Sequence, residues 1–413
     1  MSLDIMTTFR LKSVEGGVTA AKGFRAAGVP AAIKYEGRRD VALVVADSPA
    51  AAAAVFTTNA VAAAPVQYDR KAVAGGRIQA IVANSGCANA CTGAKGLADA
   101  RATALAAALA LDIDPKYVLV ASTGVIGAPL PVDRLAKGVQ LAAQKLSSSL
   151  QAGLDAAQAV MTTDTKVKQA AVRCRIGGKS VTVGGMCKGS GMIEPNMATM
   201  LGFITTDAAV SPAMLRRALS LAIAKSFNRV VVDGDESTND SVFLLASGRA
   251  GNPEIRAGGA DFDAFVAALT AVGVALARKM AADGEGATKF VTVRVKGAKT
   301  VKDAERAARA VAKSPLAKTS WYGRDPNWGR VMAAAGYSGA AVDDTKAEVF
   351  YGDVWAYRKG EVADAAQLRR LAEVLKANEL VVTVDLHLGK GEAEIYTCDF
   401  SHEYVHINAD YTT

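Results

Sequence analysis

The segment "KGSGMIEPNMATMLGFITTDA", residues 188–208, sets the problem that the rest of the chain has to solve. Its first half is a glycine-rich loop that contains Pro195, and its second half is an apolar run that is typical of a buried strand. Thr199 stands at the junction, directly after the small residue Ala198. Taken alone, a β-branched residue at the start of a strand predicts only the strand.

The hydroxyl of Thr199 also has a chemical interpretation. If the chain is cut before Thr199, the freed α-amine, with a pKa of about 8, lies beside the hydroxyl and can act as its general base. Ala198 would admit the hydroxyl to the scissile carbonyl, and the loop before it can hold a strained turn. Such a site needs no histidine. The chain has three, all near the C-terminus and in strand-like surroundings that favour structural roles: His387, His402 and His406.

Outside this segment, short apolar runs alternate with helical patterns, which predicts an α/β protein with many strands. Predicted strands cover residues 41–45, 78–82, 118–121, 181–183, 230–232 and 289–297. Predicted helices begin near residues 96, 131, 211, 261, 303 and 364. Residues 379–401 predict a hairpin that turns at Gly389–Gly391.

The length and composition predict two tightly packed lobes. The chain has 413 residues, of which 51% are hydrophobic and 21% charged, and no flexible linker divides it. No apolar run reaches the roughly 18 residues that span a bilayer, and the N-terminal segment lacks the apolar core of a signal peptide. We therefore expect a soluble cytoplasmic protein without a membrane partner.

Charge and cysteine usage exclude several classes of site. The net charge of +8 is spread along the chain and aromatic residues make up 6%, which argues against nucleic acid and favours anionic small molecules. Cys87 and Cys91 have no second pair nearby to complete a zinc site. The five cysteines are scattered, as expected of free thiols in a reducing compartment: Cys87, Cys91, Cys174, Cys187 and Cys398.

Two other motifs fail on inspection. Residues 233–240, "DGDESTND", have Thr238 where a calcium loop needs Gly, and Leu244 stands where the loop needs Glu. The run "GGMCKGSG" lacks the residue order of a phosphate-binding P-loop. The sequence therefore predicts neither a metal nor a cofactor.

Six segments, in this order, carry a resemblance to a known family. They are "ASTGVIG" (121–127), "MTTDT" (161–165), "GMCKGSGMIEPNMATMLGFITTD" (185–207), "VDGDESTND" (232–240), "DGEGATKF" (283–290) and the terminal "INADYTT". By these motifs nearly the whole chain resembles the ornithine acetyltransferase (glutamate N-acetyltransferase) family of arginine biosynthesis. The resemblance implies a layered α/β sandwich similar to N-terminal nucleophile hydrolases.

The resemblance also implies processing and an activity. Cleavage between Ala198 and Thr199 would divide the chain into an α chain, 1–198, and a β chain, 199–413, which stay together as an α2β2 assembly. The enzyme would move an acetyl group from N2-acetylornithine to glutamate by a ping-pong mechanism through acetyl-Thr199. It needs no ATP or cofactor, and the sequence leaves open whether acetyl-CoA is a second donor.

The same resemblance assigns the remaining site residues. Thr199 is the nucleophile, and the Thr123 hydroxyl and the Gly124 amide stabilise the oxyanion. Lys188 is expected to meet the α-carboxylate that ornithine and glutamate share, and Glu285 the side-chain ammonium of ornithine. The substrate-binding set is Thr162, Lys188, Thr199, Glu285, Asn408 and Thr413.

Two other interpretations stay open at this point. A self-processing aminopeptidase or amidase shares the fold and the N-terminal nucleophile. A non-catalytic small-molecule binding protein would use Thr199 only as a strand residue.

Overall fold

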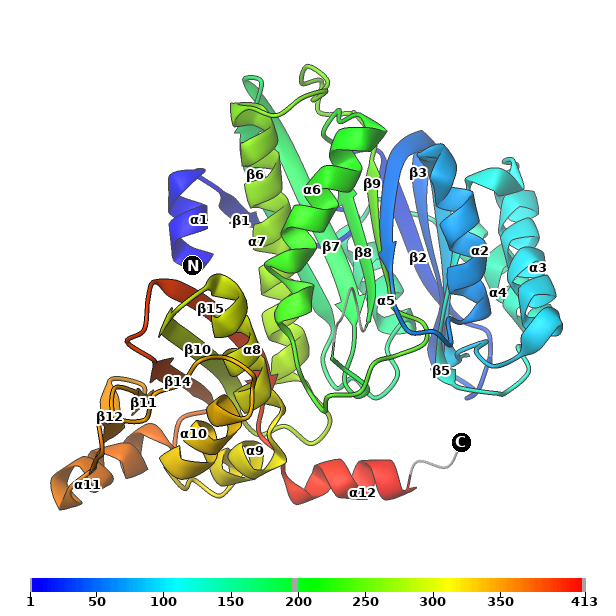
Figure 1. Cartoon of the computed structure of the whole chain (residues 1–413). Helices are drawn as coiled ribbons and strands as arrows, with labels where there is room; N and C mark the ends of the chain where they lie inside the picture. Colours follow the sequence, from blue (N-terminus) through cyan, green and yellow to red (C-terminus); the bar gives the residue numbers. More distant parts are fainter. Residues whose placement is uncertain (1, 195–199, 411–413) are drawn as a thin grey trace.

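The protein consists of two lobes, each built on one β-sheet (Figure 1). The computed structural model describes residues 2–194 and 200–410. Helices cover both sheets, and this mixed α/β architecture with two lobes confirms the predicted fold class.

The first lobe holds the larger sheet. Its strands are β1 (Lys12–Val14), β2 (Phe24–Pro30), β3 (Arg39–Phe56), β4 (Arg77–Cys87), β5 (Val118–Val125), β6 (Lys168–Ile176), β7 (Lys179–Lys188), β8 (Leu201–Thr206) and β9 (Ser241–Ala246). They are ordered β1-β6-β7-β8-β9-β3-β4-β5, and β2 pairs with β3. The helices of this lobe are α1 (Ser2–Thr8), α2 (Ala64–Ala72), α3 (Gly93–Leu111), α4 (Val132–Gln144), α5 (Leu150–Ala159), α6 (Pro212–Ala224) and α7 (Ala260–Ala282).

Alternate residues of the central strand β9 enter two different parts of the core. Val242 and Leu244 pack in the cluster that contains the buried faces of α6 and α7. Phe243 and Leu245 belong to a cluster that includes residues of α5. This period of two is the pattern of a strand that is covered on both faces, so the sheet is the middle layer of the lobe.

The second lobe holds the smaller sheet, ordered β13-β12-β11-β14-β10-β15. Its strands are β10 (Phe290–Ala298), β11 (Glu348–Tyr351), β12 (Val354–Arg358), β13 (Glu361–Val362), β14 (Glu379–Asp385) and β15 (Gly391–Cys398). Its helices are α8 (Val301–Lys313), α9 (Pro315–Tyr322), α10 (Trp328–Gly336), α11 (Ala365–Val374) and α12 (His402–Asp410). In Figure 1, α12 runs from this lobe toward the first one.

Most predicted elements are present, and three predictions are wrong. His402 and His406, which were expected in strand-like surroundings, are exposed residues of α12. The predicted hairpin over residues 379–401 does not form, because β14 and β15 both pair with β10, one on each side of it. Residues 230–232 form no strand; Val230 makes only an isolated bridge to Tyr396. All three valines are fully buried, so the apolar run signals burial and not a ladder.

Helix α7 is long and apolar enough to cross a membrane by length and composition, but it is a core helix. Of its most apolar window, 61% is buried, and the helix packs against α6, β6 and β7. Its end leads into the loop that carries Glu285, so the helix also fixes one wall of the site described below.

Asp69 on α2 is a fully buried carboxyl group that makes the stability of the protein depend on pH. Its Oδ1 accepts a hydrogen bond from the Val120 amide of β5 at 2.9 Å, and Oδ2 has no hydrogen-bond partner among the described residues. Burial raises the pKa of Asp69 well above its ordinary value. The folded protein therefore keeps a proton that the unfolded chain releases above about pH 4, and stability falls as the pH rises from there toward the folded-state pKa.

We expect Asp69→Asn to remove this part of the pH dependence while keeping an oxygen acceptor for Val120. The midpoint of thermal unfolding at pH 5 and at pH 8 should differ less in Asp69→Asn than in the unaltered protein. Asp69→Ala is the control, because it loses the acceptor and should be less stable at both pH values. Identical pH dependence in the Asn variant and the parent would show that Asp69 does not titrate as argued.

Candidate active site

A cavity of about 240 Å³ brings together the predicted site residues that the structure describes. Its walls come from the end of β5, the end of β7, the loop before β6, the loop after α7 and helix α12. The predicted residues that line it are Thr123, Gly124, Thr162, Lys188, Glu285 and Asn408. Ala198, Thr199 and Thr413 lie outside the described residues, but Met200, which follows Thr199, also lines the cavity.

The end of β5, which carries Thr123 and Gly124, is held in place by its neighbours. Gly124 has a φ of +131°, and a Cβ at this position would lie 2.4 Å from the carbonyl carbon of Gly86 on β4. Only glycine fits here. One residue earlier than Thr123, the Ser122 hydroxyl donates to Asn84 Oδ1 at 2.7 Å. The backbone amide of Gly124 is therefore fixed by the packing of two parallel strands.

Lys188 is the last residue of β7 and is 7% exposed. It stands opposite Leu201, the first residue of β8, in the antiparallel ladder. Its charge acts on the neighbouring carboxyl group of Asp164. Burial alone would raise the pKa of Asp164, but the cations of Lys188 and Lys168 lower it to about 2. A buried ammonium group of this kind is suited to bind a carboxylate of a small ligand.

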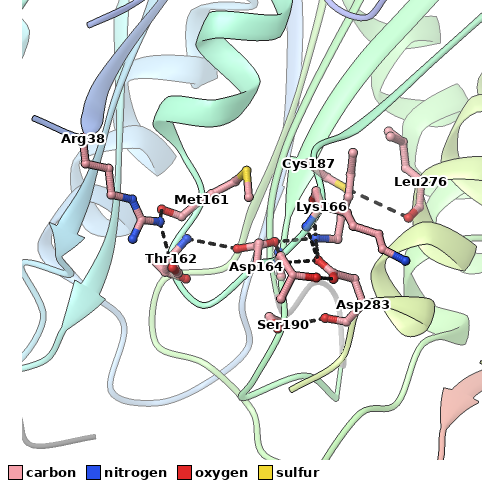
Figure 2. A network of polar contacts seen from close by, with 12 residues as sticks. Arg38, Met161, Thr162, Asp164, Lys166, Cys187, Ser190, Leu276 and Asp283 are labelled. Atoms are coloured by element: carbon pink, nitrogen blue, oxygen red, sulfur yellow. Dashed lines mark hydrogen bonds and ion pairs between the residues drawn. The ribbon is translucent and has the colours of Figure 1, made fainter. Parts of the chain in front are cut away.

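The loop that carries Thr162 is fixed from two sides (Figure 2). Arg38 donates to the backbone oxygens of Met161 and Thr162, at 2.7 and 2.8 Å. The Thr162 amide donates to Asp164 Oδ2 at 3.0 Å, and the Gly189 amide donates to Asp164 Oδ1 at 2.9 Å. Asp164 thus ties the Thr162 loop to the residue that follows Lys188.

Glu285 and Asn408 meet although 123 residues separate them. Asn408 Nδ2 donates to Glu285 Oε2 at 2.8 Å. The loop and the helix are in close contact, since a Cβ at Gly286 would lie 2.5 Å from the Tyr404 amide nitrogen. The Glu285 amide donates to the Ser190 carbonyl at 3.1 Å, which joins this wall to the Lys188 loop. A carboxylate and a cation thus face the same cavity from neighbouring loops.

Two residues of the cavity were missed by sequence reasoning: Asn239 and Asp240. Asn239 Nδ2 donates to the carbonyls of Ala88 and Ser122, at 2.6 and 2.8 Å, and so connects the start of β9 to the end of β5. Asp240 is 2% exposed, and burial raises its pKa well above the ordinary value. Both belong to residues 233–240, the motif rejected as a calcium loop. The polar run "STND" directly before an apolar strand could have indicated that these residues line a site.

The cavity has few means of holding a metal. None of its described lining residues is a histidine or cysteine. Across residues 2–194 and 200–410, no group of three or more His, Cys, Asp and Glu side chains could hold a metal ion. The chemistry that its described groups support is hydrogen bonding and charge pairing with an amino acid.

Comparison with known proteins identifies the family. A sequence model of the ArgJ family matches residues 25–413. The chain belongs to the ArgJ family. It is 55% identical over 400 residues to the arginine biosynthesis bifunctional protein ArgJ of Symbiobacterium thermophilum, a match that covers 96% of this chain and 99% of that protein. The ArgJ of Geobacter sulfurreducens is 50% identical over 393 residues, or 95% of this chain and 99% of its own.

Among solved structures, the chain is similar to the ornithine acetyltransferase of Mycobacterium tuberculosis, whose crystal structure is a complex with ornithine. It is 45% identical, and the match covers 46% of this chain and 100% of that chain, with a TM-score of 0.43. The family predicted from the six motifs is confirmed. The ArgJ chain is an acyltransferase of arginine biosynthesis, whereas the roles of its individual residues stay predictions.

We expect Gly124→Ala to lower the rate of acetyl transfer by this ArgJ protein by about 100-fold or more, because the new Cβ displaces the end of β5, where Thr123 and Gly124 line the cavity. Gly127→Ala is a matched control in the same strand-end segment. Gly127 also has a positive φ, +82°, but no atom lies within 4 Å of an added Cβ. Steady-state rates should stay within about threefold for the control, since only backbone strain is added. Equal losses in both variants would refute a specific role for Gly124.

Proposed function

We propose that this chain transfers the acetyl group of N2-acetyl-L-ornithine to L-glutamate, giving L-ornithine and N-acetyl-L-glutamate. The observation that carries the proposal is that four predicted site residues line one cavity together with Met200, the residue after Thr199. They are Thr123, Gly124, Lys188 and Glu285. These groups supply a cation, a carboxylate and two hydrogen-bond donors, the set that an amino-acid acyl transfer requires.

Charge complementarity supports the choice of substrates. Ornithine and glutamate both carry an α-carboxylate, which pairs with the ammonium group of Lys188 in the proposal. The side-chain ammonium of ornithine pairs with Glu285. Lys188 is 7% exposed and Glu285 is 8% exposed, so water and salt screen these pairs little. Ornithine is also the ligand in the solved M. tuberculosis relative.

The proposed reaction has two half-reactions. The Thr199 hydroxyl attacks the acetyl carbonyl, and the Thr199 α-amine takes the proton. The oxyanion accepts hydrogen bonds from the Thr123 hydroxyl and the Gly124 amide. The bond to the ornithine nitrogen then breaks, the departing amine receives the proton, and the acetyl group stays on Thr199 as an ester. The amine of glutamate attacks this ester by the reverse sequence.

Processing between Ala198 and Thr199 is part of the proposal, and the sheet supports it. The proposed α chain ends shortly after β7, and the proposed β chain begins shortly before β8. These strands pair over the register from Val183↔Thr206 to Lys188↔Leu201. A cut between them would leave the ladder and its buried side chains intact, so the two chains would remain associated without a covalent link.

Assembly, compartment and donor range complete the proposal. Two processed pairs would form an α2β2 heterotetramer with twice the mass of one 42.5 kDa precursor. All five cysteines are free and four are buried, which supports a reducing, cytoplasmic location. The relatives are named bifunctional proteins, which makes acetyl-CoA the second donor to test.

Self-processing is tested by denaturing electrophoresis of the purified protein. We expect two bands near half of 42.5 kDa, and the sequence of one should begin Thr-Met-Leu-Gly. Thr199→Ala lacks the hydroxyl and should stay as one uncut band. Thr199→Ser keeps a hydroxyl in the same place and should still be cut. A single band of full-length mass in active wild-type protein would overturn the N-terminal nucleophile, and the same band in protein without activity would favour the non-catalytic interpretation.

Acetyl transfer is tested against the amidase alternative by omitting the acceptor. With N-acetylornithine alone, a transferase should release about one ornithine per active site and then stop, because the acetyl ester waits for an amine. Adding glutamate should restore turnover and produce N-acetylglutamate, with parallel lines in double-reciprocal plots. Continuous release of acetate at the same rate with and without glutamate would instead identify an amidase.

A further inference from the structure

A buried cluster of charged residues lies behind the cavity and is not part of its lining. It consists of Asp164, Lys168 and Asp283, and Figure 2 shows the two aspartates with their polar neighbours. Lys168 Nζ lies 2.6 Å from Asp164 Oδ1 and 2.5 Å from Asp283 Oδ2. The three side chains are 0–4% exposed. Lys168 therefore bridges two carboxylates, one close to it in the sequence and one in a distant segment.

Each carboxylate holds backbone groups of loops that form the cavity. Asp164 accepts from the amides of Thr162 and Gly189, as described above. Asp283 Oδ2 accepts from the amides of Thr165 and Lys166, both at 3.1 Å, and its Oδ1 accepts from the Thr165 hydroxyl.

A further bond links two of these loops directly. The Ser190 hydroxyl donates to the Asp283 carbonyl at 2.9 Å. The cluster thus joins segments 162–166, 188–190 and 283–285. These segments carry Thr162, Lys188 and Glu285, three of the residues that the proposed function assigns to substrate binding.

Stability alone does not explain such a cluster. A buried ion pair is often no more stabilising than well-packed apolar residues of similar volume, because burial removes the hydration of the charged groups. What a fully bonded polar network adds is a fixed geometry. Here the negative charges of Asp164 and Asp283 are neutralised by the ammonium groups of Lys168 and Lys188. The cation proposed to bind the ligand, Lys188, is therefore coupled electrostatically to the cluster.

We propose that Lys168 is a positioning residue for acetyl transfer: through Asp164 and Asp283 it holds the segments of Thr162, Lys188 and Glu285 at the spacing that the substrates require. The inference rests on the proposed function, since that function assigns these three residues to the substrates. Lys188 serves both amino acids in that proposal. Loss of Lys168 should therefore weaken the binding of donor and acceptor alike.

Lys168→Met, which keeps the length of the side chain and removes its charge, tests the proposal. We expect KM for N-acetylornithine and for glutamate to rise about 10-fold or more, with a smaller loss in kcat. Lys289→Met is the matched control. Lys289 is also buried, at 5% exposure, but its Nζ donates to the carbonyls of Leu375 and Ala377 in the second lobe. The control should keep both KM values within about twofold. Unchanged KM in Lys168→Met would overturn the proposal.

A charge-balanced variant separates positioning from packing. In Lys168→Met/Asp283→Asn the unpaired carboxylate is neutralised, so KM should recover at least about threefold relative to Lys168→Met. If packing alone were lost, the second substitution would raise KM further, which would refute the proposal.

The pH profile of KM gives a second test of the proposal. Removing a cation raises the pKa of Asp164, so KM of Lys168→Met should increase toward acidic pH more steeply than that of the wild type.

Two further measurements keep the proposal testable if Lys168→Met does not fold or if the wild type does not transfer acetyl groups. Thr165→Val removes only the hydroxyl bond to Asp283 and should raise both KM values about threefold even if Lys168→Met does not fold. Calorimetric binding of ornithine requires no turnover. A weaker affinity in Lys168→Met or Thr165→Val supports the inference even if the wild type fails to transfer acetyl groups. Wild-type affinity in Thr165→Val together with unchanged KM would overturn it.

Discussion

The antiparallel pairing of β7 with β8 is the constraint around which the molecule is arranged. It places Lys188, the last residue of β7, opposite Leu201, the first residue of β8. The cation and the segment after Thr199 therefore lie at the same end of the strands. Strand β9 runs parallel to β8, and its start lies at the same edge. There Asn239 reaches across to the Ser122 carbonyl of β5. One ladder and one bridging amide thus bring Met200, which follows the proposed nucleophile, and the proposed oxyanion donors Thr123 and Gly124 to one cavity.

The cavity concentrates charges that are costly to bury, and the surrounding network offsets that cost. Lys188 and Glu285 line the cavity, while Asp164, Lys168 and Asp283 stand behind them with every oxygen of the two aspartates bonded. A pKa of about 2 keeps Asp164 charged at neutral pH, so the amides of Thr162 and Gly189 keep a charged acceptor. Rigid loops matter for a two-substrate site, because the donor has to be placed against the nucleophile and the acceptor afterwards against the ester that forms there.

Local patterns in the sequence predicted most of the elements, and the family motifs predicted residues that line one cavity, while the roles of these residues stay predictions. The helix that begins after Ser211 follows from its N-cap, and the Met214 amide does donate to that hydroxyl. What could not be predicted depends on contacts between distant residues. Strand β10 inserts between β14 and β15, which turns an apparent hairpin into two separate pairings. Lys168 resembles an ordinary strand-edge lysine in the sequence, since its partner Asp283 lies 115 residues away.

The scarcity of histidine and the proposed division of the chain share one physical explanation. A threonine hydroxyl needs a base, and in this chain the base with a suitable pKa is the α-amine that a cut would create. A cut in most places would release a strand end and expose apolar surface. Between β7 and β8 it would not, because the two strands are paired in one ladder and their side chains pack in one buried cluster, which holds Val181 and Val183 before the proposed cut and Ile204 after it. The pairing that assembles the cavity is therefore also what permits the break that would activate it.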